Sequence, residues 1–289
     1  MRSRGLDCEL VSRVPDSGIV VAHTRHLPKR ILPRRGRFLV CIEADRGRRP
    51  FCQLHVQQNP EGTVIANRRL AARLDRRIAR LPASNHFMYY WPQPGLVPRD
   101  AGRGERFENV VYMGNVANIA PELLEPGFRE RLKALGMNFV FEKDPLRWRD
   151  YSNVDAVLAV RDFTGRPHHR KPASKLINAW HAGVPALLAP ESAYLAERRS
   201  ELDFMVVRSV DDIVEALARL KADPELRRRM IGNGRQRAEE RSEAAIAAMW
   251  HRFLEEVVTP AYESWQTLGV FRRSAFVLAR CVGYFDRTR

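Results

Sequence analysis

Two lysines and a serine gather where a helix is predicted to begin. Lys171, Ser174 and Lys175 follow a loop and lie at the start of a run of apolar residues at helical spacing. The N-terminus of a helix has N–H groups without helical partners and a partial positive charge, which together favour an anion. Ammonium and hydroxyl groups at that place predict a phosphate site. An ordinary strand–helix crossover with solvated lysines would have the same spacing, so both interpretations stay open.

The same stretch predicts the elements that would position these side chains. Pro172 suits the first turn of a helix, because the N–H that it lacks has no partner there, and Gly183 suits the helix end. The apolar runs 154–160 and 184–189 predict buried parallel strands on either side of the helix. The first turn of the helix would then lie at the carboxyl edge of the sheet, where ligands gather in open α/β folds.

Basic side chains flank that edge. Arg161 follows the strand at 154–160, and Arg170 ends the loop before the helix, so both are expected among bound phosphates. His168 and His169 lie in the same loop. No third ligand follows them at a useful spacing, and no metal site is predicted there.

The residues from Asn178 to Pro185 resemble the donor-binding signature of GT-B glycosyltransferases, in which a helix with an acidic or amide residue precedes small-x-Gly-x-Pro and a strand. The run from Lys175 to Ala179 is similar to fucosyltransferase-type members, in which a lysine at this point meets the nucleotide diphosphate. The resemblance is clearest over residues 85–250. It implies that Lys175 binds the donor diphosphate and that Asn178 takes a donor-contacting position.

The resemblance implies further donor contacts. A strand predicted at 110–115 ends in Gly114 and Asn115, and GT-B proteins have a comparable glycine loop that approaches the donor phosphates, although Gly-Asn is also a common turn. Glu191 and Ser192 follow the strand after the helix, in a loop that lies near the donor sugar in related enzymes. A helix N-cap would explain Ser192 equally well.

Retaining GT-B enzymes carry two glutamates that flank the start of this helix. Arg170 and Asn178 stand at those two positions here, eight residues apart. The resemblance therefore does not imply whether the anomeric configuration would be retained or inverted.

The order of elements from residue 110 onward is typical of a doubly wound parallel sheet. Together with the resemblance it predicts an α/β protein of GT-B type with two Rossmann-like domains. We expect a reduced N-terminal acceptor-side domain at 1–105, which ends in a Pro/Gly hinge at 91–105. A nucleotide-sugar donor domain is expected at 106–258, and a C-terminal helix that packs back on the first domain at 259–289.

The remaining hydrophobic periodicity predicts an amphipathic helix at 68–81, a helix at 121–135 and a long charged helix from 224 to about 253. Strands are predicted at 51–56 and 86–91 in the first domain.

Three side chains of the first domain could act as a base toward an acceptor hydroxyl. His23 follows a strand predicted at 18–22, and Glu43 and Asp45 follow one at 38–42. Two plain alternatives remain, namely a surface histidine without a task and acidic residues that cap a turn.

Charge and composition set the possible partners. The chain has 289 residues, 45% of them hydrophobic, which fits a globular protein. Its 49 Lys and Arg outnumber 34 Asp and Glu, for a formal net charge of +15. Phosphorylated ligands, nucleic acid or an anionic membrane suit such a charge, and a general arginine bias would also produce it. No nucleic-acid-binding motif stands out, so no such partner is expected.

The four cysteines form no C-x-x-C pair, which indicates a reduced, cytoplasmic protein. The N-terminus lacks the apolar run of a signal peptide, and no apolar run reaches the roughly 20 residues of a membrane span. The tail from Pro260 to Arg289 has a helical pattern. It either crosses back to the first domain or offers a basic amphipathic surface for peripheral contact with an anionic inner membrane.

These features predict a glycosyltransferase, of the hexosyl- or pentosyl-transferring kind, that uses a nucleotide-diphosphate sugar and a glycan, lipid or protein acceptor. No cofactor and no metal are expected, because Lys171, Lys175 and the helix N-terminus would stabilise the leaving diphosphate. Two alternatives come from other classes. One is a catalytically silent GT-B relative that binds a sugar nucleotide or a partner protein, and the other is a basic nucleic-acid-binding protein.

Overall fold

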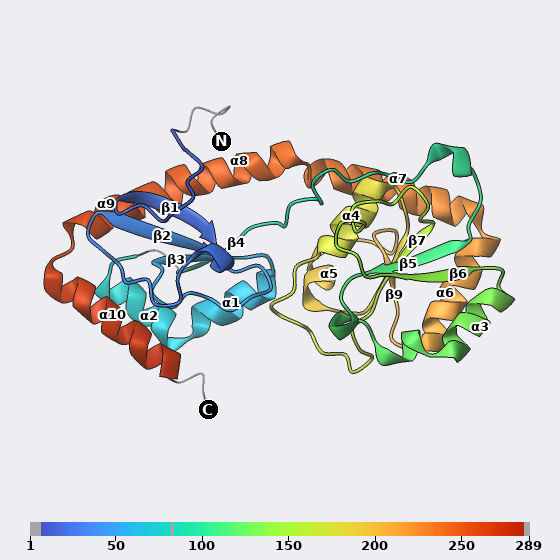
Figure 1. Ribbon diagram of the computed structural model, residues 1–289, viewed down its shortest axis with the longest axis horizontal. Helices are drawn as coiled ribbons and strands as arrows, with labels where there is room; N and C mark the ends of the chain where they lie inside the picture. The colour runs from blue at the N-terminus through green and yellow to red at the C-terminus, as the bar shows by residue number, and fades with distance from the viewer. Residues whose placement is uncertain (1–6, 82–83, 286–289) are drawn as a thin grey trace. The chain divides into compact units, whose positions relative to one another are not determined.

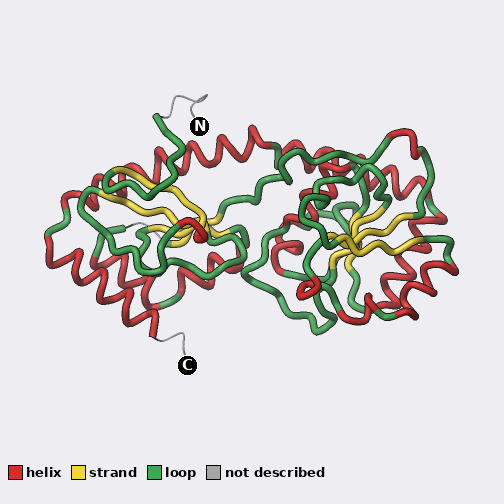
Figure 2. The backbone as a smooth tube through the Cα atoms, viewed as in Figure 1, coloured by secondary structure: helices red, strands yellow, loops and turns green. Residues whose placement is uncertain are grey.

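The computed structural model describes residues 7–81 and 84–285. The first residues, where no signal peptide is predicted, and the last four of the predicted helical tail lie outside the described residues. The described chain divides into two compact units (Figures 1 and 2). Unit 1 contains the chain up to Tyr89, the stretch His169–Pro172 and the chain from Ile246 onward, and unit 2 contains the rest. The Pro/Gly segment at 91–105, expected as a hinge, therefore belongs to unit 2.

Unit 2 is built on a five-stranded parallel sheet with the order β6-β5-β7-β8-β9. The chain moves from β5 outward to β6 and then returns to β7 on the other side of β5, so the strand order reverses between β5 and β7. In open α/β sheets, ligands bind beside the carboxyl ends of strands at such a reversal. The strands are β5 (Asn109–Met113), β6 (Asn138–Glu142), β7 (Ala156–Ala159), β8 (Ala186–Leu188) and β9 (Met205–Val206).

Alternation along β5 gives unit 2 an apolar core on each face of its sheet. Val110 and Tyr112 belong to one core and Val111 and Met113 to the other. Helices cover both cores, which confirms the predicted doubly wound α/β class. The first core includes residues of α3 (Pro126–Ala134) and α6 (Val210–Ala222), and the second those of α4 (Ser174–Ala182), α5 (Ser192–Glu197) and α7 (Pro224–Glu240).

Unit 1 has a four-stranded parallel sheet whose strands lie in chain order. The strands are β1 (Gly18–His23), β2 (Arg37–Ile42), β3 (Leu54–Gln57) and β4 (Asn85–Phe87). Phe38 and Val40 face a core shared with helices, whereas Leu39 and Cys41 face a smaller core that includes Leu27 from the connection between β1 and β2. A 3-10 turn, Thr24–His26, follows β1 directly.

The helices of unit 1 come from both ends of its sequence. They are α1 (Pro60–Arg68), α2 (Leu70–Ile78), the main part of α8 (Glu243–Phe253), a π-helical turn at Leu254–Val258, α9 (Thr259–Thr267) and α10 (Val270–Phe285). Helix α10 packs against α2, where Arg280 and Asp75 form a buried ion pair with an N–O distance of 2.7 Å. The C-terminal helices thus complete the core of the unit that also holds the N-terminal sheet.

Several predicted element bounds are wrong, because local caps and turns override the periodicity. The helix predicted at 68–81 is α2, which begins later and ends earlier, at 70–78, and extended Arg69 separates it from α1. Helix α1, which Asn59 caps by accepting from Gly62 N, was not predicted. The helix predicted at 121–135 begins as a 3-10 turn and becomes α-helical only from Pro126. The long helix from 224 is interrupted at Arg241.

The strands predicted at 51–56 and 86–91 are also shorter than expected, at 54–57 and 85–87.

Candidate functional site

Gly114 and Lys175 meet at the strand-order reversal of unit 2. Gly114 directly follows β5 and is buried. A Cβ at position 114 would lie 3.5 Å from Lys175 Nζ and 3.0 Å from the Tyr112 ring. The Lys175 ammonium itself lies 5.1 Å from the centroid of that ring. A side chain at position 114 would therefore crowd the Tyr112 ring, whereas glycine leaves the backbone open beside the lysine ammonium.

Helix α4 fixes Lys175 at its first turn. The helix begins at Ser174 and ends at Gly183, whose φ of +71° is the left-handed cap predicted from the sequence. Leu176 and Ile177 are buried in the sheet-facing core, so they set the rotation of the helix. The N-cap, Ala173, supplies no side-chain hydrogen bond. The first-turn N–H groups thus lack a side-chain cap from that residue, which suits an anion site.

Arg161 and Glu191 form an ion pair at the ends of neighbouring strands. Their side chains are 12% and 3% exposed. Burial opposes the charge of Arg161, but Tyr194, Glu191 and Tyr112 together raise the pKa of its guanidinium above the ordinary value. Burial likewise raises the pKa of Tyr112, although Arg161 acts in the opposite direction. Glu191 therefore holds Arg161, so its carboxylate is committed to a protein partner.

The other predicted donor contacts of unit 2 have different surroundings. Asn115 is exposed and begins a 3-10 turn after β5. Ser192 starts α5 and donates its backbone N–H to the Pro167 carbonyl at 2.9 Å. Asn178 is buried and accepts from Gln93 N at 2.9 Å, and it also hydrogen-bonds Tyr151. Asn178 thus anchors the segment after Tyr90 to α4.

In unit 1, the predicted phosphate and base residues come together. Lys171 Nζ lies 3.2 Å from an Asp45 carboxylate oxygen, and the Lys171 carbonyl accepts from the Asn59 side chain at 3.1 Å. Burial opposes ionisation of Asp45, but the hydrogen bond and charge of Lys171 outweigh it and lower the pKa of that carboxyl. Arg170 is exposed, and its guanidinium lies near Gly47 in the same loop region as Asp45.

His23 ends β1 and caps the turn that follows. Its Nδ1 accepts from Arg25 N at 3.1 Å, so this nitrogen is already engaged. Burial, followed by the charges of Arg25, His26 and Arg46, lowers the pKa of His23, against a smaller opposing effect of Asp45. The imidazole is therefore held in its neutral form, the state that a base requires.

Glu43 has surroundings that fit a structural role. Its side chain is 7% exposed, lies 3.3 Å from Arg48 Nε and accepts from the Gln57 side chain at 3.0 Å. Its backbone carbonyl also accepts from Arg46 N and so closes the turn. Of the three base candidates, Asp45 is the one with a substantially exposed carboxylate, at 47%.

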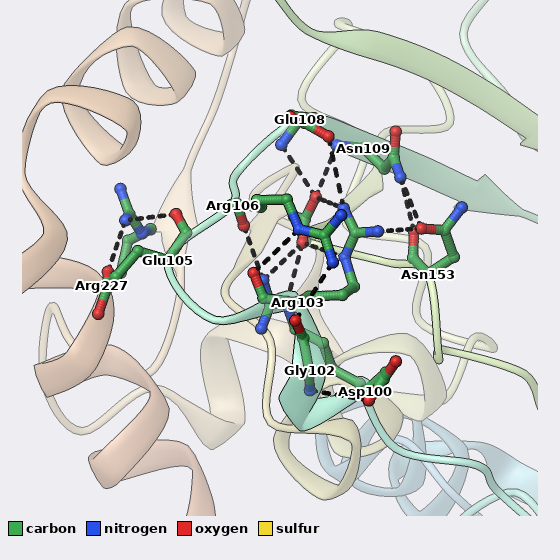
Figure 3. Close-up of polar contacts among 11 residues, drawn as sticks. Asp100, Gly102, Arg103, Glu105, Arg106, Glu108, Asn109, Asn153 and Arg227 are labelled. Carbon is green, nitrogen blue, oxygen red and sulfur yellow. Dashed lines mark hydrogen bonds and ion pairs between the residues drawn. The ribbon is translucent and has the colours of Figure 1, made fainter.

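A buried ionic cluster that was not predicted from the sequence lies at the amino ends of β5 and β7 (Figure 3). Asp155, whose side chain is 0% exposed, accepts from Arg99, from Arg103 and from the backbone N–H groups of Glu108 and Asn109. It lies before β7, and Asn109 begins β5. An aspartate inside the apolar run at 154–160 was the signal available for it. The cluster fastens the chain that leads into β5.

Tyr112 is the other residue that the sequence did not single out. Its ring lies under the Lys175 ammonium, and its hydroxyl is buried. The positive charge of Arg161 acts on this hydroxyl and opposes the rise in its pKa.

Within residues 7–81 and 84–285, no three His, Cys, Asp or Glu side chains gather closely enough to hold a metal ion. Among the helices of the same described residues, none is long and apolar enough to cross a membrane.

Comparison with known proteins bears on the class of this fold. Residues 146–252, less than half of the chain, match a family model described as glycosyl transferase-like. This region contains α4 and the strands on either side of it. No curated protein matches the chain.

Solved structures show the same fold at low sequence identity. HepE of Anabaena, in complex with UDP and glucose, has a TM-score of 0.52 and 11% identity, over 76% of this chain and 72% of that one. A TarM variant of S. aureus, in complex with fondaparinux, α-GlcNAc-glycerol and UDP, has a TM-score of 0.53 and 8% identity, over 75% and 50%. The chain spans 59% of a matched sucrose-phosphate synthase from Thermosynechococcus elongatus. The fold is of the GT-B type, with two Rossmann-like units.

Proposed function

We propose that this protein is a glycosyltransferase that uses a nucleotide-diphosphate sugar and transfers the sugar to a glycan acceptor. The observation that carries the proposal is the Lys175 ammonium beside Gly114, at the carboxyl end of β5. Lys175 itself lies within the region that matches a glycosyl transferase-like family. The geometry supports binding of a diphosphate, which would lie against the glycine backbone, the ammonium and the first turn of α4.

The proposed chemistry is stabilisation of a leaving diphosphate by charges that are already in place. As the bond between the anomeric carbon and the phosphate oxygen breaks, negative charge grows on the diphosphate. Lys175 and the α4 N-terminus would stabilise that charge without reorganisation. Arg161, held by Glu191, adds a second cation at the next strand end. These cations are the basis for proposing a reaction without a metal, which activity in excess EDTA would test.

The acceptor base is proposed to be Asp45. Its carboxylate is the most exposed of the three candidates, and Lys171 keeps it ionised near neutral pH. An ionised carboxylate of this kind can accept the proton of an acceptor hydroxyl. His23 is the second candidate, because its imidazole is neutral and the charge of Asp45 acts to raise its pKa.

The nucleotide is the first point to test, with UDP as the leading candidate because HepE and TarM were each solved with UDP. A thermal-shift series with UDP, GDP, ADP, dTDP and CMP should show one nucleotide that stabilises the wild type. A ligand at about 100 times its dissociation constant stabilises a fold by ~2.7 kcal/mol, which is a measurable shift. Lys175→Ala should lose most of the shift, while Lys133→Ala, an exposed lysine of α3, should keep it.

A catalytically silent sugar-nucleotide-binding protein is the second candidate. It is favoured by Arg170 and Asn178, which stand where retaining enzymes carry glutamates, and by the engagement of Asn178 with Gln93 and Tyr151. Slow hydrolysis of the matching nucleotide sugar, lost in Lys175→Ala, would establish the enzyme. A nucleotide shift without hydrolysis or transfer would establish the silent relative, and no shift with any nucleotide would overturn both.

A further inference from the structure

Helix α10 carries an exposed apolar face at its outer side. Val270, Phe271 and Leu278 are 69%, 92% and 66% exposed. Helical spacing places these three side chains on one face together with the exposed Ser274. Contact between water and the ring of an almost fully exposed phenylalanine is unfavourable. This face is therefore suited to a partner that removes the ring from water.

The opposite face of α10 is firmly held within unit 1. Phe276 is buried and packs edge-to-face on Trp265, with ring centroids 5.2 Å apart. Arg280 forms the buried ion pair with Asp75 of α2. The helix therefore already has its core contacts, and these contacts present the apolar face outward.

The surroundings of this face are basic. The sequence from Val270 to Cys281 contains no acidic residue and, besides the buried Arg280, two arginines. Arg272 is exposed, and Arg273 donates to the Leu268 carbonyl at the start of the helix. Arg35 donates to the Gln266 carbonyl at 3.1 Å, which brings another exposed arginine to the turn before α10. Between residues 259 and 281 the single acidic residue is Glu263.

We propose that this face of α10 docks on an anionic lipid surface. Apolar side chains flanked by arginines fit a bilayer interface, where the apolar groups enter the acyl boundary and the guanidinium groups meet phosphate headgroups. An acidic protein surface would satisfy the arginines but would leave Phe271 and Leu278 against polar groups. A second copy of this chain would bring like charges together. Charge complementarity thus favours lipid over both.

Flotation of the full chain with vesicles tests this proposal. We expect binding to vesicles that contain phosphatidylglycerol, weak binding to pure phosphatidylcholine, and release at high salt. Phe271→Ser should weaken binding by about tenfold or more, because the largest apolar side chain of this face is lost. Arg272→Gln should weaken it by about fivefold. Leu146→Ser, which removes an 80% exposed leucine from unit 2, should bind as the wild type does.

The outcomes separate lipid from other occupants. Equal binding of the wild type and the folded Phe271→Ser variant to anionic vesicles would overturn the proposal, as would no binding of the wild type. A concentration-dependent dimer that Phe271→Ser abolishes would also overturn it and would assign the face to a second copy. Circular dichroism and the urea unfolding midpoint of each variant show whether the chain is still folded.

Discussion

Lys171 Nζ and an Asp45 carboxylate oxygen lie 3.2 Å apart in unit 1, so a predicted phosphate ligand is paired with a predicted base. The sequence places these residues 126 positions apart, and nothing in their spacing shows the contact. The pair has two consequences for the proposed reaction. Lys171 keeps the carboxylate ionised, and Asp45 holds the ammonium in place.

Asp45→Asn is the variant that tests the base. We expect kcat to fall by roughly 100-fold or more, because an amide cannot accept the proton from the acceptor hydroxyl. Nucleotide binding should persist, since Lys175 is unchanged, and unfolding free energy should change by under about 1 kcal/mol, because the pair is partly exposed. Asp16→Asn, which alters another exposed ion pair of unit 1, is the matched control. Full activity of Asp45→Asn would shift the assignment to His23.

Glu191→Gln separates a structural role of the Arg161–Glu191 pair from a direct role in binding. The substitution leaves a largely buried guanidinium without its carboxylate, so we expect a loss of about 3 kcal/mol in urea unfolding. The double variant Arg161→Met, Glu191→Leu should recover much of that stability. If Arg161 meets the donor phosphates, the recovered double variant will still bind the nucleotide more weakly than the wild type. Normal nucleotide affinity in the double variant would confine the pair to a packing role.

The sequence predicted the elements around the donor motif well because their signals are local. Gly183 ends α4 by its left-handed conformation, and Leu176 and Ile177 follow helical spacing. The α/β class followed from the same periodicity. The partners of Asn178 and Glu191 could not be predicted, since each depends on a residue from a distant part of the sequence. Helix α1 also escaped prediction, because residues 60–67 lack the leucine and arginine periodicity that predicted α2.

Mild acid is expected to destabilise unit 2 through His181. Burial lowers the pKa of this histidine below 6.5, although the Arg241 carbonyl and Glu243 oppose the shift. As pH falls through about 6.5, the unfolded chain therefore takes up a proton before the folded protein does, and stability decreases. The unfolding free energy measured from pH about 8 to about 5.5 should fall for the wild type. His181→Gln should show a shallower fall, and an unchanged slope would show that other histidines, such as His23, dominate.

The Asp155 cluster should support folding without touching the donor site. Asp155→Asn removes a carboxylate that accepts hydrogen bonds from Arg99, Arg103 and two backbone N–H groups. We therefore expect the unfolding free energy measured in urea to fall by about 3 kcal/mol or more. Burial opposes ionisation of Asp155, but Arg103 and the backbone donors lower its pKa, so its stabilisation persists above pH about 4 and fades as acid protonates it. Because Asp155 precedes β7 whereas Gly114 follows β5, the folded variant should bind the nucleotide with unchanged affinity. Asp100→Asn, an exposed acid in the same segment, should cost far less, and a large drop in nucleotide affinity of folded Asp155→Asn would show that the two edges of the sheet are coupled.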